Sequence, residues 1–208
     1  MTNLEQAPTA TDSGRWRESA VDAALALCRE RAFHEFDISD IAARAGVDVE
    51  TLHSRWPDRK LLVAEALLGS VAPRMTFGAT GDLTVDLRAQ LAATIEVFAD
   101  PHIGPHLVAL TAEASRDQRL AGFFLKHVFG PNRAAARARF ELAQEQGQLR
   151  TDLDLNTAVD MVFGPIWFRL LLNTGPLTAD LADSLTEHAL RGLAPRPETG
   201  APSGSSPA

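Results

Sequence analysis

Residues 38–56 read ISDIAARAGVDVETLHSRW, and their spacing predicts two short helices that cross steeply over a tight turn. A close crossing needs a small side chain in the first helix, which Ala42 supplies. The turn needs a residue that tolerates a positive φ, and Gly46 follows four residues later. Val47 fills the space between the helices, and Leu52 belongs to the same small core. This spacing favours a helix-turn-helix over an ordinary helical hairpin with a glycine turn.

Helical periodicity continues on both sides of this stretch. Upstream, an apolar stripe predicts an amphipathic helix that ends near Phe33. The stripe consists of Val21, Leu25, Cys28 and Ala32. Downstream, the pattern predicts helices over residues 59–71, 83–99, 105–115, 118–130, 131–146, 155–172 and 177–193. Because the alternation typical of strands is absent, the chain is predicted to be all-α.

Composition shifts indicate where the chain divides. Residues 73–82 hold a proline, two glycines and two threonines, which predicts a domain boundary. We expect an N-terminal three-helix helix-turn-helix domain over residues 15–76 and a larger C-terminal helical bundle over residues 77–194. Residues 1–14 and the tail over residues 195–208, which is rich in Pro, Gly and Ser, are expected to be disordered.

The overall composition points to a compact protein of a reducing compartment. Hydrophobic residues make up 45% of the chain and charged residues 23%, so a core can form. The polar N-terminus does not have the pattern of a signal peptide. The most apolar run, residues 161–172, is interrupted by Gly164 and Pro165 and is shorter than the roughly 20 residues that span a bilayer. The single cysteine, Cys28, is typical of a small core residue. We therefore expect a cytoplasmic protein without membrane contact.

The N-terminal part resembles the DNA-binding signature of TetR-type transcriptional regulators. The resemblance is carried by ISDIAARAGV at residues 38–47, Thr51, Leu52, His53, Trp56, Pro57 and Arg59. The C-terminal part is similar more loosely, through its length, its helix count and the run GPIWFRLLL at residues 164–172. The resemblance implies a ligand-responsive DNA-binding regulator, usually a repressor. Such a protein binds a palindromic operator as a homodimer and is released by a small apolar effector.

The resemblance also implies where double-stranded DNA is contacted. Residues 38–45 would support residues 48–56, which would enter the major groove. His53 stands where the family usually has a phosphate-binding tyrosine, and Arg59 where it has a phosphate-contacting lysine. With Leu52 and Trp56 facing inward, Glu50 and Ser54 point away from the core. The predicted base-facing residues are Val49, Glu50, Thr51, His53 and Ser54, and the other predicted DNA-binding residues are Arg44, Arg55, Arg59 and Lys60. Arg15 and Arg17 are equally consistent with DNA contacts and with a solvated helix start.

Charge argues against strong DNA binding. The formal net charge of the chain is −7, and the segment from Arg15 to Lys60 holds eight cations against nine anions. Asp48 is expected to cap the second short helix. Glu50 either accepts a hydrogen bond from a cytosine amino group or repels DNA and keeps the non-specific affinity low. The alternative function is therefore a helical small-molecule-binding or scaffold protein without sequence-specific DNA binding.

A ligand pocket and a dimer interface are both expected in the C-terminal bundle. The candidate pocket residues, each also consistent with an ordinary core position, are Phe98, His102, His106, Leu110, Glu113, Phe124, Phe163 and Trp167. The candidate dimer residues, which would otherwise fill the core of one chain, are Phe163, Trp167, Leu170, Leu171, Leu181, Leu185 and Ala189. The effector, the operator sequence and the regulated genes have no signal in the sequence.

Enzyme and metal chemistry find little support in the sequence. No phosphate loop, nucleophile elbow or dinucleotide fingerprint occurs, so we predict no catalytic residues. His102 and His106 are four residues apart, but Gly104 and Pro105 break the helical spacing that would aim both at one ion. We therefore expect neither a metal nor another cofactor.

Overall fold

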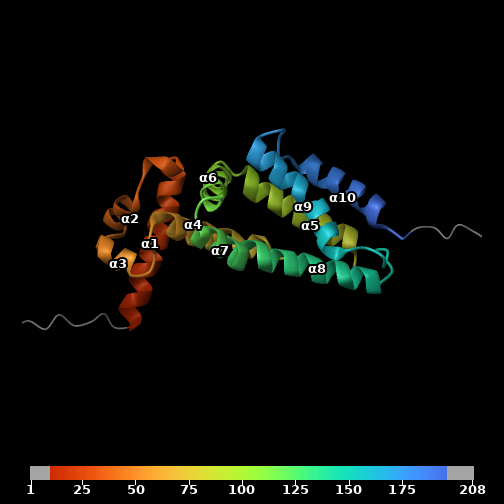
Figure 1. Ribbon diagram of the computed structural model, residues 1–208, viewed down its shortest axis with the longest axis horizontal. Coiled ribbons are helices and arrows are strands. Elements are labelled where there is room, and N and C mark those ends of the chain that lie inside the picture. The colour runs from red at the N-terminus through yellow and green to blue at the C-terminus, as the bar shows by residue number, and fades with distance from the viewer. Residues whose placement is uncertain (1–9, 196–208) are drawn as a thin grey trace, which may run out of the picture.

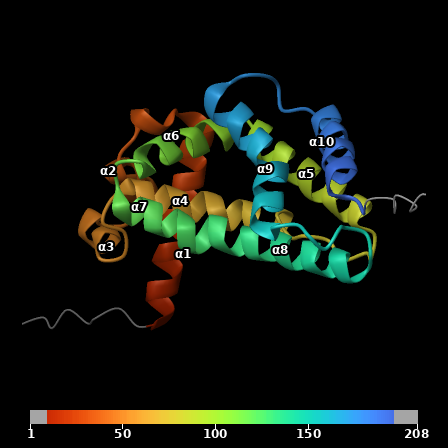
Figure 2. The ribbon, with the colours of Figure 1, turned by 45° about the vertical axis from the view of Figure 1, so that its right-hand side comes forward.

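The computed structural model describes residues 10–195, with side chains from Gly14 onward. Within this range every regular element is a helix, as predicted, and the elements form an elongated bundle (Figure 1). Helices α1–α3 lie at one end, and α5, α9 and α10 lie at the other (Figures 1 and 2). The elements are α1 (Ala10–Glu30), η1 (Phe33–Glu35), α2 (Ile38–Ala45), α3 (Val49–His53), α4 (Arg59–Val71), η2 (Ala72–Arg74), α5 (Leu83–Ala99), α6 (Gly104–Ala114), α7 (Gln118–Phe124), η3 (Leu125–Phe129), α8 (Gly130–Glu145), α9 (Leu155–Leu172) and α10 (Ala179–Leu193).

The local geometry of α2 and α3 confirms the predicted helix-turn-helix. The Asp37 side chain accepts hydrogen bonds from two backbone N–H groups in the first turn of α2 and so caps that helix. Helix α2 ends at Gly46, whose φ of 68° lies in the left-handed region that favours glycine. The Val47 N–H then donates to the Ala42 carbonyl over 3.1 Å, which closes the turn. The two helices therefore cross where the sequence predicts.

Helix α1 is longer than predicted at its N-terminus. Residues 1–14 are predicted to be a disordered arm, but α1 begins at Ala10. The prediction places the start of helical periodicity at Arg15, whereas a nucleated helix extends through polar residues at little cost. No proline lies between Ala10 and Glu30 to stop it. The rest of the predicted arm, residues 1–9, and nearly all of the predicted tail, residues 196–208, lie outside the described residues.

Helix α3 is shorter than the predicted 48–56 and ends at His53. Asp48 occupies its N-cap position, but its side chain makes no capping hydrogen bond, so the predicted capping role of Asp48 is wrong. The Asp48 carboxylate stays exposed just before the short helix that carries Glu50. Trp56, which follows the helix, is buried as predicted.

Helices α7 and α8 are joined by the π-helix η3 into one continuous rod (Figure 1). Pro131 is predicted to separate two helices, but it lies in the first turn of α8 without ending the helical path. The wider π turn explains this, because the Gly130 N–H donates to the carbonyl of Leu125, five residues back. A Cβ atom at Gly130 would lie 2.7 Å from that carbonyl oxygen, so glycine permits the close approach.

Two hydrophobic cores hold the bundle together. One joins α1–α4 to α6 and α7 through Leu110, Leu120 and Phe124. The other lies among α5, α8, α9 and α10. Ile103 packs against both cores. The division at residues 76 and 77 stays a prediction, but each predicted part holds most of one core.

A buried ion pair fixes the loop that precedes α5. Arg139 Nε of α8 donates to Asp86 Oδ2 of α5 over 2.7 Å, and the two side chains are 4% and 0% exposed. The backbone N–H and the hydroxyl of Thr80 donate to Asp86 Oδ1 over 3.0 and 2.7 Å. Burial alone would raise the pKa of Asp86, but the hydrogen bonds from Thr80 and Arg139 hold that pKa below its usual value. The loop before α5 is thereby fixed to α8.

Candidate functional site

The exposed face of α3 carries hydrogen-bond acceptors. Glu50, His53 and Ser54 are exposed, whereas Val49 and Thr51 are half-buried. The Ser54 hydroxyl donates to the Thr51 carbonyl over 2.6 Å, which leaves its oxygen lone pairs outward. His53 Nδ1 lies 3.1 Å from the Pro57 carbonyl, which only accepts, so Nδ1 carries the proton and a neutral ring leaves Nε2 as an acceptor. Together with the Glu50 carboxylate, these groups suit partners that donate.

The predicted phosphate-binding cations are already engaged within the chain. Arg44 forms two hydrogen bonds of 2.5 Å with Glu30. The Arg59 guanidinium lies 4.5 Å from the ring centre of Phe33 and donates to the Phe36 carbonyl. A DNA phosphate must therefore compete with an internal partner for each of these groups.

Lys60 connects the helix-turn-helix region to the C-terminal part. Its Nζ atom lies 2.6 Å from Asp117 Oδ2 at the start of α7 and 3.8 Å from Glu113 Oε2 at the end of α6. The hydrogen bond to Asp117 holds the pKa of Lys60 above its usual value. Asp117 also caps α7 by accepting from two backbone N–H groups. Lys60 is thus directed at the junction of α6 and α7 instead of a DNA backbone.

Glu65 is a shared acceptor that sequence analysis missed. It accepts from Arg17 over 2.6 Å, from Arg55 over 3.2 Å and from Trp56 Nε1 over 2.9 Å. Partial burial would raise the pKa of Glu65, but the hydrogen bonds from Arg17 and Trp56 hold it below its usual value. Glu65 stands alone in a helical apolar segment, and only the tertiary fold brings its three partners together. One carboxylate is therefore shared by the predicted backbone contact Arg55 and by Arg17.

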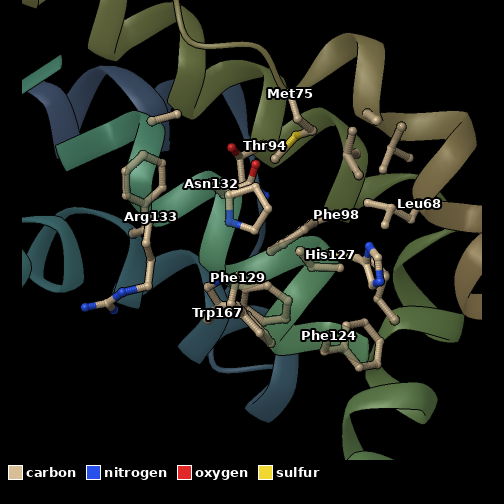
Figure 3. Close-up of a pocket in the computed structure, with 18 of the residues that line it drawn as sticks. Leu68, Met75, Thr94, Phe98, Phe124, His127, Phe129, Asn132, Arg133 and Trp167 are labelled. Atoms are coloured by element: carbon tan, nitrogen blue, oxygen red, sulfur yellow. The ribbon is translucent and has the colours of Figure 1, made fainter. Parts of the chain in front are cut away.

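A cavity of about 530 Å³ lies between α4, α5, α6, α8, α9 and the π-helix η3 (Figure 3). Five of the eight predicted pocket residues line it, and these are Phe98, Leu110, Phe124, Phe163 and Trp167. Its wall also includes Leu67, Leu68 and Val71 of α4, His127 and Phe129 of η3, and Gln90 and Thr94 of α5. The volume lies within the usual range for small-molecule sites.

The three other predicted pocket residues lie away from the cavity. His106 is buried, and its Nε2 lies 2.8 Å from the Cys28 carbonyl, so it joins α6 to α1. Glu113 is exposed near Lys60, and His102 is exposed in the loop before α6. They are predicted as polar groups near apolar helices, but the directions of their side chains depend on how α6 packs. No group of three or more His, Cys, Asp or Glu side chains that suits a metal ion occurs in the described part of the chain.

The outer face of α9 carries exposed apolar side chains. By length and composition alone, α9 would be able to cross a membrane, but it packs against α5, α6, α8 and α10. Met161, Phe168 and Leu172 are 61%, 56% and 63% exposed and recur on one side of the helix, and we call them the α9 stripe. Large exposed apolar groups of this kind mark interaction surfaces.

The predicted dimer residues are distributed differently. Leu171 is exposed beside the α9 stripe, whereas Leu181 is buried in the core. Phe163 and Trp167 line the cavity. Leu170, Leu185 and Ala189 are half-buried against the C-terminal core. Because both sides of α9 are apolar, residues of its inward side were predicted to form the interface.

Comparisons with known proteins cover most of the chain. Residues 20–66 match the family of bacterial regulatory proteins named tetR, and residues 77–189 match a tetracyclin repressor-like C-terminal domain. The HTH-type transcriptional regulator YdeS of Bacillus subtilis is 25% identical over 176 residues, which cover 85% of this chain and 88% of that protein. The regulator AqdR of Rhodococcus erythropolis is 26% identical over 145 residues, which cover 70% of this chain and 69% of that protein. The crystal structure of the TetR family regulator SCO0332 is 29% identical, covers 87% of this chain and all of that chain, and superposes with a TM-score of 0.74.

Proposed function

The chain belongs to the TetR family of bacterial regulators, and from this membership we propose that it is a repressor that releases a palindromic operator when an apolar effector binds. It is a DNA-binding transcriptional regulator with a ligand-binding C-terminal domain. The family is one of regulators and not of enzymes. Family membership also favours this interpretation over a scaffold without DNA binding. We expect it to act in the cytoplasm, where its DNA is.

Helix α4 carries the proposal, because it belongs to both functional regions. Its first residues follow the helix-turn-helix, and its Trp56-facing side holds Glu65. Its C-terminal half supplies Leu67, Leu68 and Val71 to the cavity wall. An effector that fits the cavity best when α4 is displaced would therefore move α2 and α3 as well. The operator is then released because the effector and the operator bind most tightly to different positions of α4.

Operator recognition is proposed to depend on the acceptors of α3. Adenine and cytosine present amino groups in the major groove, and these donate to carboxylate, hydroxyl and imidazole acceptors. Glu50, His53 and Ser54 are the exposed acceptors of this helix, and Thr51 lies between them. Because the nearby cations are paired, affinity is expected to come mainly from these base contacts. The dependence of binding on salt is then expected to be shallow.

The partner in the proposed dimer is a second copy of the chain. The α9 stripe, Met161, Phe168 and Leu172, offers an apolar surface that a two-fold related copy would cover. Such a dimer would set two α3 helices apart by about one DNA turn, roughly 34 Å, in the operator complex. The distance between the two Thr51 residues in a complex structure measures this directly.

A binding-site selection with the full-length protein tests the proposed operator recognition. We expect the selected sequences to be palindromic, and Glu50→Ala to change the preference at one base pair of each half-site. The matched control is Glu18→Ala, which removes the same charge from the exposed side of α1. Selection of no defined sequence would contradict the proposal. An unchanged preference in Glu50→Ala would contradict the contact with an amino group.

A further inference from the structure

We propose that the cavity takes a neutral, mainly aromatic molecule with one hydrogen-bond donor, a hydroxyl or an N–H group, that bonds Gln90 Oε1. This inference rests on the proposed function only for its regulatory outcome, because binding to the cavity is measured without DNA. It is carried by one unpartnered polar group, by the charges of the cavity wall and by its aromatic side chains.

The unpartnered group is the amide oxygen of Gln90. Gln90 lines the cavity, is 6% exposed, and its Oε1 is buried with no hydrogen-bond partner. Its Nε2 donates to the Met75 carbonyl over 3.4 Å, and because that carbonyl only accepts, the unpartnered atom of the amide is the oxygen. A buried acceptor without a donor is costly, and a bound donor removes that cost. The terminal amide torsion is soft enough to turn the oxygen toward a ligand.

Thr94 strengthens the need for a donor at this end of the cavity. The Thr94 hydroxyl donates to the main-chain carbonyl of Gln90, one helical turn back, over 2.8 Å. Only lone pairs of Thr94 Oγ1 then remain for a ligand. Thr94 lines the cavity as well (Figure 3). A ligand that only accepts would offer no donor to Gln90 Oε1 or to Thr94 Oγ1.

The charges around the cavity select against an ionised ligand. The titratable lining residues are His127, Arg133 and Asp160. Arg133 and Asp160 pair with each other, are 43% and 59% exposed, and the Arg133 guanidinium points away from the aromatic rings (Figure 3). His127 is exposed and lies tilted against Phe123 with ring centres 4.8 Å apart. A carboxylate or ammonium at Gln90 would therefore be buried without a counter-charge.

The walls fit a flat ring system. Trp167 lies edge-to-face with Phe98 at 4.6 Å between ring centres, and tilted against Phe129 at 5.3 Å. Phe77, Phe124 and Phe163 also belong to the aromatic lining, and Phe124 is seen in Figure 3. These edges and faces favour aromatic partners over aliphatic chains of equal area. At about 30 Å³ for each water, 530 Å³ corresponds to roughly 18 water-sized groups, which suits two rings with substituents.

The test compares three probes by isothermal titration calorimetry with the full chain in the absence of DNA. They are 4-hydroxybiphenyl, 4-methoxybiphenyl and biphenyl-4-carboxylate, which differ in one substituent. We expect the phenol to bind wild type about tenfold more tightly than the ether, as one hydrogen bond to a buried acceptor predicts. The carboxylate is expected to bind most weakly. Gln90→Leu is expected to reduce the preference for the phenol to less than about twofold, because leucine has no acceptor.

The controls separate the donor contact from general effects on the fold. Gln118→Leu changes an exposed glutamine at the start of α7, outside the cavity, and is expected to keep the wild-type preference. The wild-type comparison alone decides the outcome if Gln90→Leu does not fold. The proposal is overturned if the ether or the carboxylate binds wild type as tightly as the phenol. It is also overturned if Gln90→Leu keeps the preference or if no probe binds.

A second measurement distinguishes this inference from the proposed function. If the phenol binds as expected but a saturating concentration leaves the operator complex intact, the proposed release mechanism fails and the cavity chemistry stands. If the operator is bound sequence-specifically but no probe binds, the proposed cavity ligand is wrong, whereas the proposed role as a DNA-binding regulator is supported.

Discussion

Replacement of Glu65 with glutamine separates the internal role of Arg55 from its predicted role on DNA. In wild type, the Glu65 carboxylate accepts from Arg55 over 3.2 Å and from Arg17 over 2.6 Å. Glutamine keeps an acceptor for Trp56 Nε1 but loses the charge that holds both arginines. We therefore expect Glu65→Gln to free Arg55 for a phosphate and to increase DNA affinity at low salt.

The magnitude follows from the release of counterions. Each phosphate contact contributes a slope of about 0.9 in log affinity against log salt, so one new contact in each half-site adds about 1.8 for a dimer. Over a fourfold rise in salt, that extra slope costs about 12-fold in affinity beyond the wild-type loss. The stability of Glu65→Gln is expected to fall while its DNA affinity rises. Two largely solvated ion pairs contribute about 1–2 kcal/mol together, which corresponds to a fall in Tm of about 2–8 °C.

Fluorescence anisotropy on a selected operator between 50 and 200 mM salt measures the slope. The matched control is Glu18→Gln, which changes the net charge equally but forms no ion pair among the described residues. We expect the control to change the affinity slightly and the slope hardly at all. The reasoning is refuted if Glu65→Gln and Glu18→Gln give the same slope, because Arg55 then stays away from the DNA even when its partner is removed.

Three further substitutions test other contacts. Asp86→Asn leaves Arg139 buried without a counter-charge, so we expect the free energy of unfolding at pH 7 to fall by about 3–5 kcal/mol in urea denaturation. Because the pKa of Asp86 is lowered in the folded state, its ionised form stabilises the fold above about pH 4, and this contribution disappears as the pH falls further. The difference between variant and wild type is therefore expected to narrow in acid, and a constant difference would contradict the assignment. Phe168→Asp is expected to convert a dimer into monomers in analytical ultracentrifugation with unchanged helix content, whereas Leu142→Asp on α8 keeps the dimer. Lys60→Met is expected to leave the salt dependence of DNA binding unchanged, because Lys60 is paired with Asp117; a slope lower by about 0.9 for each half-site would assign it to a phosphate.

Local signals in the sequence predicted much of the fold. Asp37, Asp58 and Asp154 cap the helices that follow them, and Gly46 ends α2 in the left-handed region. These outcomes depend on hydrogen bonds within a few residues, so spacing indicates them, although the same reasoning failed for Asp48. The predicted bounds 59–71, 83–99 and 155–172 agree with the structure for the same reason.

The partners of the charged residues lie beyond the range of such signals. Lys60 pairs with Asp117 and Arg44 with Glu30, and nothing near either cation in the sequence indicates that it is engaged. Residue type and position predicted DNA contacts for both. The same limit applies to the cavity: Phe98 and Trp167 were predicted from apolarity, but Gln90 was missed because its importance lies in an unmade hydrogen bond.

The continuous rod of α7, η3 and α8 has a mechanical consequence. Its N-terminal end holds Asp117, and the π turn at His127, in the cavity wall, lies ten residues further along. At 1.5 Å for each residue, the arm between them is about 15 Å long. A tilt of about 5° at the π turn would displace Asp117 by about 1.3 Å, enough to stretch its 2.6 Å bond to Lys60 beyond hydrogen-bonding distance. A small angular change at the cavity wall is therefore expected to decide whether Asp117 keeps its hydrogen bond to Lys60 of α4.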